Sequence, residues 1–269
     1  EVCVRAARGA PEEEVTQAVV DLGRRLEKSI FRRHPSLVQR LRNAIYPEHV
    51  LPVMTRMIQD PGTLQGQKTL LDILFQHGHR PEQDLAVLRT LHNMAEEQPI
   101  GITIAVLLAR ACEADGRLQA AGRLYKDTLE RAPNDPYVLS AMAAFLLDVA
   151  DRPVQARALA DKAVGLSKDQ NPELHARSLD TLARIQAKLG LWHPAETTIA
   201  RSIEAKDMAV NRRHCAEILV AMGNPEDAVK HLQRARLLAH RTGHTSELAE
   251  VNTLIEDLRT RRPDLFESA

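Results

Sequence analysis

The feature that most constrains the fold of this sequence is a spacing that recurs four times between Thr103 and Arg236. Each copy begins with an alanine, continues with a second residue four positions later, and ends with a small or β-branched residue after three more. Residues four and three apart share one face of an α-helix, so each copy predicts a helix with one packed face. The four sets are Ala121/Tyr125/Thr128, Ala156/Ala160/Ala163, Ala195/Ile199/Ser202 and Ala228/Leu232/Ala235.

The distance between successive sets indicates helices that come in pairs. The first alanines are Ala121, Ala156, Ala195 and Ala228, so the intervals are 35, 39 and 33 residues. This length is typical of repeats built from two helices and two turns. A second helical segment precedes each set at a fixed offset: Leu108-Ala109…Cys112, Met142-Ala143…Leu146, Leu182-Ala183…Gln186 and Cys215-Ala216…Leu219. The sequence therefore predicts a row of antiparallel helix pairs in which each pair packs on the next.

This pattern resembles the tetratricopeptide repeat family, whose helix-turn-helix unit reads W-x2-L-G-x2-Y, then A-x3-F, then P. Residues 102–112 supply a first helix, Gly116 a turn, residues 121–125 the start of a second helix, and Pro133 the close. The resemblance covers residues 102–236, although the family's first tryptophan is missing from every repeat. It implies an all-α fold, a right-handed α-α superhelix. The tryptophan position holds Ala105, Leu139, Leu179 and Arg212.

The chain divides into three predicted parts. Residues 1–62 predict three helices outside the repeat frame, and residues 63–241 predict one degenerate and four clearer repeats. Residues 242–269 predict a C-terminal capping helix and tail, with Ser246 as the N-cap and a polar outer side, as an exposed solenoid end requires.

Composition and charge exclude several classes of function. Lys and Arg number 36 and Asp and Glu number 36, so the whole chain presents no net field that would attract nucleic acid or an anionic membrane. Residues 22–42 hold seven basic side chains and one acid, which we interpret as a solvated face or a docking face for an acidic protein. The longest apolar run, residues 102–109, is too short for membrane insertion.

Weaker signals predict the full-length protein, the compartment and the source of the chain. Its first residue is glutamate, which we interpret as the start of a segment from a larger polypeptide. The three cysteines are isolated, as in a reducing compartment, and this favours a cytoplasmic location. The alanine- and arginine-rich style suggests a bacterial source.

No motif predicts catalysis, a cofactor or a metal. Residues 62–69 nearly match a phosphate-binding loop, but Gln67 replaces the second glycine and the backbone could not wrap a phosphate closely. The histidines lack cysteine or carboxylate neighbours at ligand spacing. No G-x-S-x-G or H-E-x-x-H sequence is present. We therefore predict a chain that is not an enzyme.

The resemblance implies a binding surface, because ligands of the family lie on the concave face formed by the first helices. Its groove positions correspond to Arg110, Glu113, Tyr137, Arg177, Asp180, Arg184, Lys188, Arg213 and His214. Arg177, Arg184 and Lys188 follow at intervals of seven and four, so they form a stripe along one helix face. Arginine suits bidentate capture of carboxylates, so the expected partner is a protein or peptide, acidic or carrying a carboxylate. The asparagines of the family's chaperone-tail clamp are absent.

These observations favour a non-enzymatic scaffold that binds a partner segment in the groove. Two alternatives remain open: a regulatory arm of an enzyme encoded elsewhere in the full-length chain, and an RNA-binding helical repeat, which the neutral charge disfavours. A third reading treats the groove residues as ordinary charges on an open surface.

Overall fold

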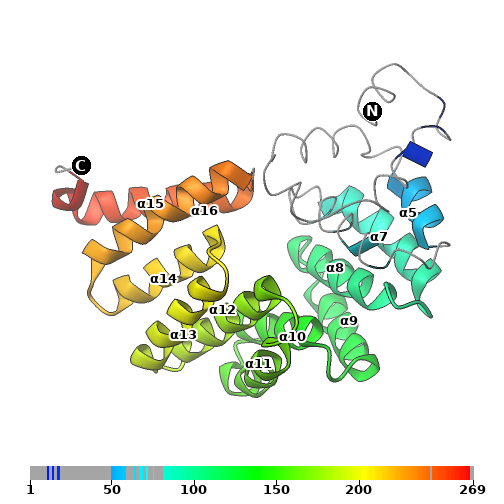
Figure 1. Ribbon diagram of the computed structural model, residues 1–269, viewed down its shortest axis with the longest axis horizontal. Helices are drawn as coiled ribbons and strands as arrows, with labels where there is room; N and C mark the ends of the chain where they lie inside the picture. Colours follow the sequence, from blue (N-terminus) through cyan, green and yellow to red (C-terminus); the bar gives the residue numbers. More distant parts are fainter. Residues whose placement is uncertain are drawn as a thin grey trace. The chain divides into compact units, whose positions relative to one another are not determined.

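A computed structural model describes residues 50–58, 81–242 and 244–266, with nine single positions between residues 11 and 75. All regular elements in these residues are helices, which confirms the predicted all-α fold (Figure 1). Most of the first two predicted N-terminal helices, and the basic segment 22–42, lie outside the described residues. The helices are α5 (Val50–Ile58), α7 (Pro81–Ala95), α8 (Gly101–Ala114), α9 (Leu118–Arg131), α10 (Pro136–Asp148), α11 (Pro153–Ser167), α12 (Pro172–Lys188), α13 (Trp192–Ala205), α14 (Ala209–Ala221), α15 (Pro225–Thr242), α16 (Thr245–Arg261) and the short 3-10 helix η2 (Pro263–Phe266).

The chain splits into two compact units, Glu1–Leu124 and Tyr125–Ala269. In the first unit, α7 packs against α5 and α8. The apolar spacing of α5 predicts one packed face, and its five residues Val50, Val53, Met54, Met57 and Ile58 are all buried. In α7 the same reasoning predicts a packed face of Leu85, Leu88, Leu91 and Met94. It is wrong at Met94, which is 39% exposed, whereas Ala95 is buried. Ala95 lies four positions after the buried Leu91 and so continues the packed face, while Met94 points to its side.

In the second unit the helices form the predicted pairs. Consecutive helices from α10 to α16 pack on one another, and α10, α12, α14 and α16 also contact each other in that order. These four are the first helices of successive pairs, so they make one layer, while α11, α13 and α15 make the other. Groove residues predicted on first helices therefore share a layer here.

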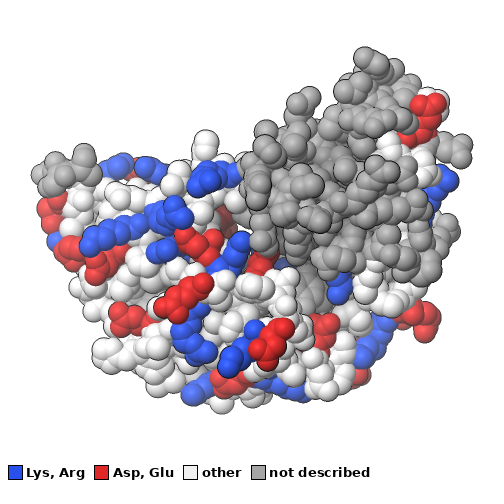
Figure 2. All heavy atoms as spheres, in the orientation of Figure 1, with Lys and Arg blue, Asp and Glu red and all other residues white. Residues whose placement is uncertain are grey.

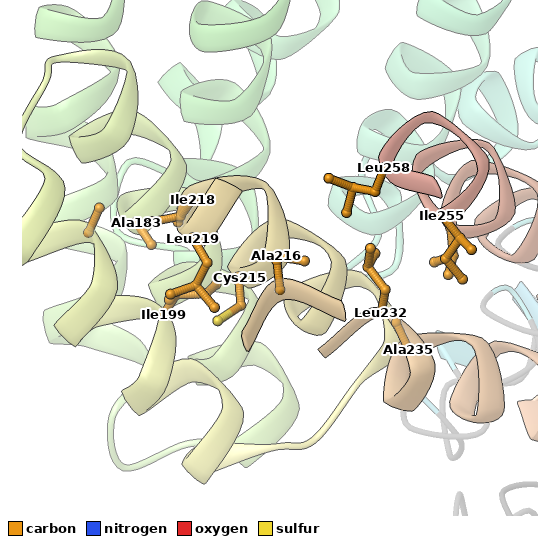
Figure 3. Packing of buried hydrophobic residues seen from close by; sticks show 13 residues of the cluster. Ala183, Ile199, Cys215, Ala216, Ile218, Leu219, Leu232, Ala235, Ile255 and Leu258 are labelled. Carbon is orange, nitrogen blue, oxygen red and sulfur yellow. The ribbon is translucent and has the colours of Figure 1, made fainter. Parts of the chain in front are cut away.

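The core of the second unit follows the predicted register (Figure 3). All twelve residues of the four recurring sets, of which Ala121 alone lies in the first unit, are at most 2% exposed. Alanines occupy the sites where helices cross most closely, and Ile199, Leu219, Leu232 and Ile255 fill the spaces between them. Ala183 and Ala195, predicted to be buried at crossings, are fully buried.

Ala195 supplies a test of this packing. Replacing Ala195 with leucine should lower the free energy of unfolding by about 1–3 kcal/mol, because its site has no room for three more carbons. Ala200→Leu on the same helix is the matched control, since Ala200 is exposed. Chemical denaturation followed by circular dichroism would measure both variants. Equal stability of the two variants would contradict the assigned register.

The turns inside the helix pairs need a left-handed backbone. Gly116, Gly190 and Gly223 have φ values of 76, 74 and 83°, and each lies five residues before the first alanine of a set. In the α10–α11 turn the same place holds Asp151, with φ of 49°. This conformation costs most side chains roughly 1–2 kcal/mol, and Asp and Asn somewhat less. Asp151 is therefore an exception among the turns.

Prolines and one aspartate mark the starts of several helices, but the predicted cap of the last helix is wrong. Prolines begin α10, α11, α12 and α15, where their missing N–H costs nothing. Asp135 caps α10 by accepting the backbone N–H of Tyr137 at 2.8 Å. Ser246, predicted as the cap of the last helix, instead lies inside the first turn of α16, which begins at Thr245.

Candidate functional site

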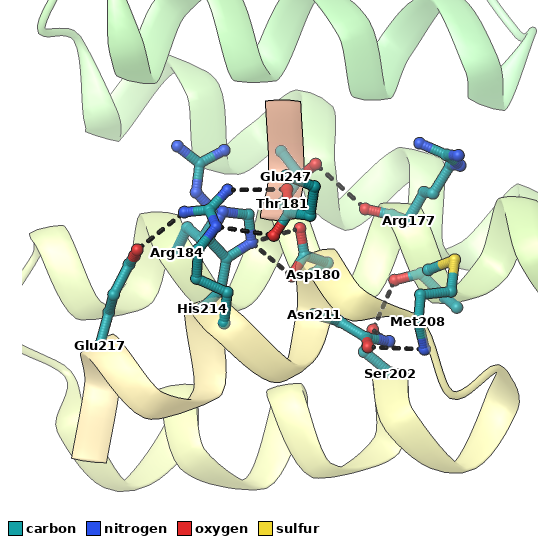
Figure 4. A network of polar contacts seen from close by, with 12 residues as sticks. Arg177, Asp180, Thr181, Arg184, Ser202, Met208, Asn211, His214, Glu217 and Glu247 are labelled. Carbon is teal, nitrogen blue, oxygen red and sulfur yellow. Dashed lines mark hydrogen bonds and ion pairs between the residues drawn. The ribbon is translucent and has the colours of Figure 1, made fainter. Parts of the chain in front are cut away.

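A buried, hydrogen-bonded pair of side chains joins the third and fourth repeats within the first-helix layer. Asp180 on α12 and His214 on α14 are 6% and 5% exposed. Nδ1 of His214 donates to both carboxylate oxygens of Asp180, at 2.8 and 2.9 Å (Figure 4). Burial alone would raise the pKa of Asp180, but His214, with Arg184 and Arg213 nearby, holds that pKa below its ordinary value. The pair therefore links two repeats.

Arg213, next to His214, ties α14 to the last helix. Its Nε donates to Glu247 at 2.8 Å, its Nη1 to Glu217 at 2.7 Å, and its Nη2 lies 2.9 Å from Glu250. Its side chain is only 14% exposed. Burial would lower the pKa of Arg213, but the hydrogen bonds and charges of Glu247 and Glu217 raise it above the ordinary value. Its guanidinium is largely engaged within the chain.

The predicted stripe on α12 forms looser pairs. Arg184 donates from Nη2 to Asp148 on α10, and Nζ of Lys188 lies 3.1 Å from Asp151 in the α10–α11 turn. Arg177 reaches Glu173, one turn earlier on its own helix, at 3.5 Å. Exposed pairs of this kind contribute about 0–1 kcal/mol each, because water screens them. The stripe is therefore paired but accessible.

The remaining predicted residues are Tyr137, Arg110 and Glu113. Tyr137 is half-buried in the first turn of α10. Arg110 and Glu113 are half-buried on α8. They belong to the first unit, so the site described above consists of the second unit alone.

A buried polar cluster that sequence reasoning missed fixes the start of α14. Asn211 is fully buried, and its Nδ2 donates to Ser202 Oγ at 3.0 Å and to the Lys206 carbonyl at 2.8 Å. Ser202 in turn donates to the carbonyl of Ala176 on α12 at 2.7 Å. Arg213 and His214 follow two and three residues after Asn211, so this cluster positions them.

The same groove positions also predict Asp148 and Glu217 beside Asp180, but the other acidic partners of the predicted cations, Glu173, Asp151, Glu247 and Glu250, were missed. A periodic signal marks several of them, because Asp148 and Arg184 are 36 residues apart, and the pairs Asp180–His214 and Arg213–Glu247 are both 34 apart. Each such pair spans about one repeat and joins adjacent first helices. Acidic and basic side chains accordingly lie side by side over the second unit (Figure 2).

Two further properties concern the described residues alone. No three His, Cys, Asp or Glu side chains among them are grouped as a metal ion would require. None of the described helices is long and apolar enough to cross a membrane.

Helix pairs in series, with one layer of first helices, define an α-helical repeat protein. The family model for the tetratricopeptide repeat matches residues 104–137, from α8 to the first turn of α10. This match shows that residues 104–137 are similar to a tetratricopeptide repeat, and the four in-register sets extend the same pattern along the chain.

A curated relative and several solved structures are similar to this chain. Cellulose synthase operon protein C of Pseudomonas fluorescens (strain SBW25) is 31% identical over 155 residues, which are 55% of this chain and 11% of that protein. The crystal structure of NprR in complex with its cognate peptide NprX has a TM-score of 0.62 at 15% identity, covering 96% of this chain and 75% of NprR. Yeast Tom70 has a TM-score of 0.55 at 14% identity, covering 94% of this chain and 55% of Tom70. The structural likenesses establish the fold.

Proposed function

We propose that this chain is a non-enzymatic protein–protein interaction module that binds a partner segment on the first-helix layer of its second unit. The observation that carries this proposal is the row of charged side chains on α10, α12, α14 and α16. Repeats of this superfamily serve as interaction scaffolds. NprR, a neighbour in fold, binds a peptide, so the fold is compatible with such a ligand. The much greater length of the Pseudomonas relative supports a place within a longer bacterial protein.

The stripe formed by Arg177, Arg184 and Lys188 is the proposed recognition element, and its ligand is an acidic or carboxylate-bearing segment. Among the described residues each cation has one acidic partner, so donor groups remain for a ligand. A guanidinium has five N–H donors and Arg184 uses one for Asp148. Arg213 has a supporting role, because three carboxylates already surround it.

Balanced charge separates this proposal from nucleic-acid binding. An RNA-binding surface would present a basic track without matching acids. Here acids lie beside the stripe at Glu173, Asp148 and Asp151. A short segment whose carboxylates take over individual contacts suits such a surface better than a continuous polyphosphate.

The test uses a fluorescently labelled oligoglutamate peptide as the probe and anisotropy as the readout. Arg184→Glu should weaken binding about 10- to 100-fold, since a charge-assisted contact contributes about 1.5–3 kcal/mol. The control is Arg201→Glu, which makes the same charge change at an exposed position of α13. Circular dichroism would verify that both variants remain helical. Binding that weakens equally in both variants would mean that only total charge matters.

A further inference from the structure

The α10–α11 turn departs from the other described turns of its kind. Gly116, Gly190 and Gly223 supply the left-handed residue elsewhere, whereas this turn uses Asp151. A side chain held in a strained conformation calls for a reason. In this turn the reason is the ion pair that the carboxylate of Asp151 forms with Lys188.

Asp151 does not act alone. Asp148, three residues earlier at the end of α10, accepts a hydrogen bond from Arg184 on α12. Two acids three residues apart thus meet two bases four residues apart on the first helix of the following repeat. The arrangement is that of a short acidic segment placed against the stripe.

We propose that Asp148 and Asp151 act as an internal competitor, which occupies part of the stripe and lowers its affinity for the partner's carboxylates. This inference rests on the proposed function, because it concerns regulation of the same site. A ligand carboxylate can replace Asp148 and Asp151 in these contacts, because their side chains are 44% and 75% exposed. The displaced carboxylates would then be solvated by water.

Two buried contacts between helices of this layer do not suit exchange. The Asp180–His214 pair is buried, so a ligand cannot replace either partner without leaving a desolvated charge. Arg213 is enclosed by three carboxylates at 14% exposure. The exchangeable contacts between α12 and the preceding repeat therefore lie at the end of α12 that carries Arg184 and Lys188.

Asp151→Gly tests the inference with little risk to folding, because glycine is the residue that the equivalent turns already use. This variant should bind the oligoglutamate peptide about two- to fivefold more tightly than the unaltered chain, and Asp148→Asn/Asp151→Gly about tenfold more tightly. The matched control, Asp161→Asn, removes an acid that forms an exposed ion pair with Arg157 on α11. It should leave the affinity nearly unchanged.

Three outcomes separate the claims. Tightening in the Asp151 variants beyond that of Asp161→Asn supports the internal competitor. If the unaltered chain binds the peptide through the stripe, yet Asp151→Gly binds no more tightly than the control, the competitor is wrong and the proposed function stands. If neither the unaltered chain nor the double variant binds the peptide, both proposals are overturned.

Discussion

Replacing His214 with leucine should destabilise the second unit by about 3 kcal/mol, because the buried carboxylate of Asp180 would lose its hydrogen-bond donor. The imidazole now donates to the carboxylate of Asp180 at 2.8 and 2.9 Å. In the variant an apolar side chain would take its place, and the carboxylate would lose this donor. Arg184 and Arg213 act on Asp180 only at longer range, so they compensate in part. Urea denaturation followed by circular dichroism would measure the loss.

The double variant Asp180→Leu/His214→Leu is the matching control. Removing both polar side chains leaves no buried carboxylate without a hydrogen-bond donor, so most of the lost stability should return. If the double variant is as unstable as the sum of the two single variants, the two side chains do not act as a pair.

The same pair has a predictable pH dependence. The pKa of Asp180 in the folded chain lies below its ordinary value of 3.8, so the contacts that favour its ionised form contribute their full stability above that value. The contribution is lost as the pH falls through the lowered pKa, because protonation removes the charge that His214 stabilises. The loss of unfolding free energy in His214→Leu, relative to the unaltered chain, should become smaller as the pH is lowered. The carboxyl group of Asp180 has no imidazole partner in the variant and can take up a proton. Denaturation curves at neutral and acidic pH would show this convergence.

The repeat architecture could be predicted because its signal depends on short, rigid spacings. Alanine is required where two helices cross closely, and the interval of four and three residues fixes one helix face. The twelve positions of the recurring sets are therefore buried as predicted. The prediction that Met94 is buried was wrong, because spacing alone does not decide which of two neighbouring apolar residues continues the packed face of a helix.

The chemistry of the first-helix layer was less predictable. The groove positions of Arg177, Arg184 and Lys188 follow from the resemblance, but their acidic partners depend on how long side chains bend between repeats and turns. Asp151 could be singled out only as the non-glycine member of a row of turn glycines. A lone Asn211 on a first helix gives no sequence signal of burial, since its three hydrogen-bond partners come from a distant serine and from backbone groups.

Reversing the charge of all three cations in the stripe is the most direct test of the binding site. Arg177→Glu/Arg184→Glu/Lys188→Glu should weaken binding of the oligoglutamate peptide by at least about 100-fold, because several charge-assisted contacts are lost together and repulsion replaces them. The matched control reverses three exposed cations on second helices, Arg157, Arg201 and Lys230, and so changes the net charge equally.

Calorimetric titration of the peptide into the unaltered chain and both triple variants, with helicity checked beforehand, decides the matter. Binding that is lost in the stripe variant and kept in the second-helix variant is what the first-helix site predicts. Undiminished binding in the stripe variant would contradict that site and make the basic segment 22–42 the better candidate.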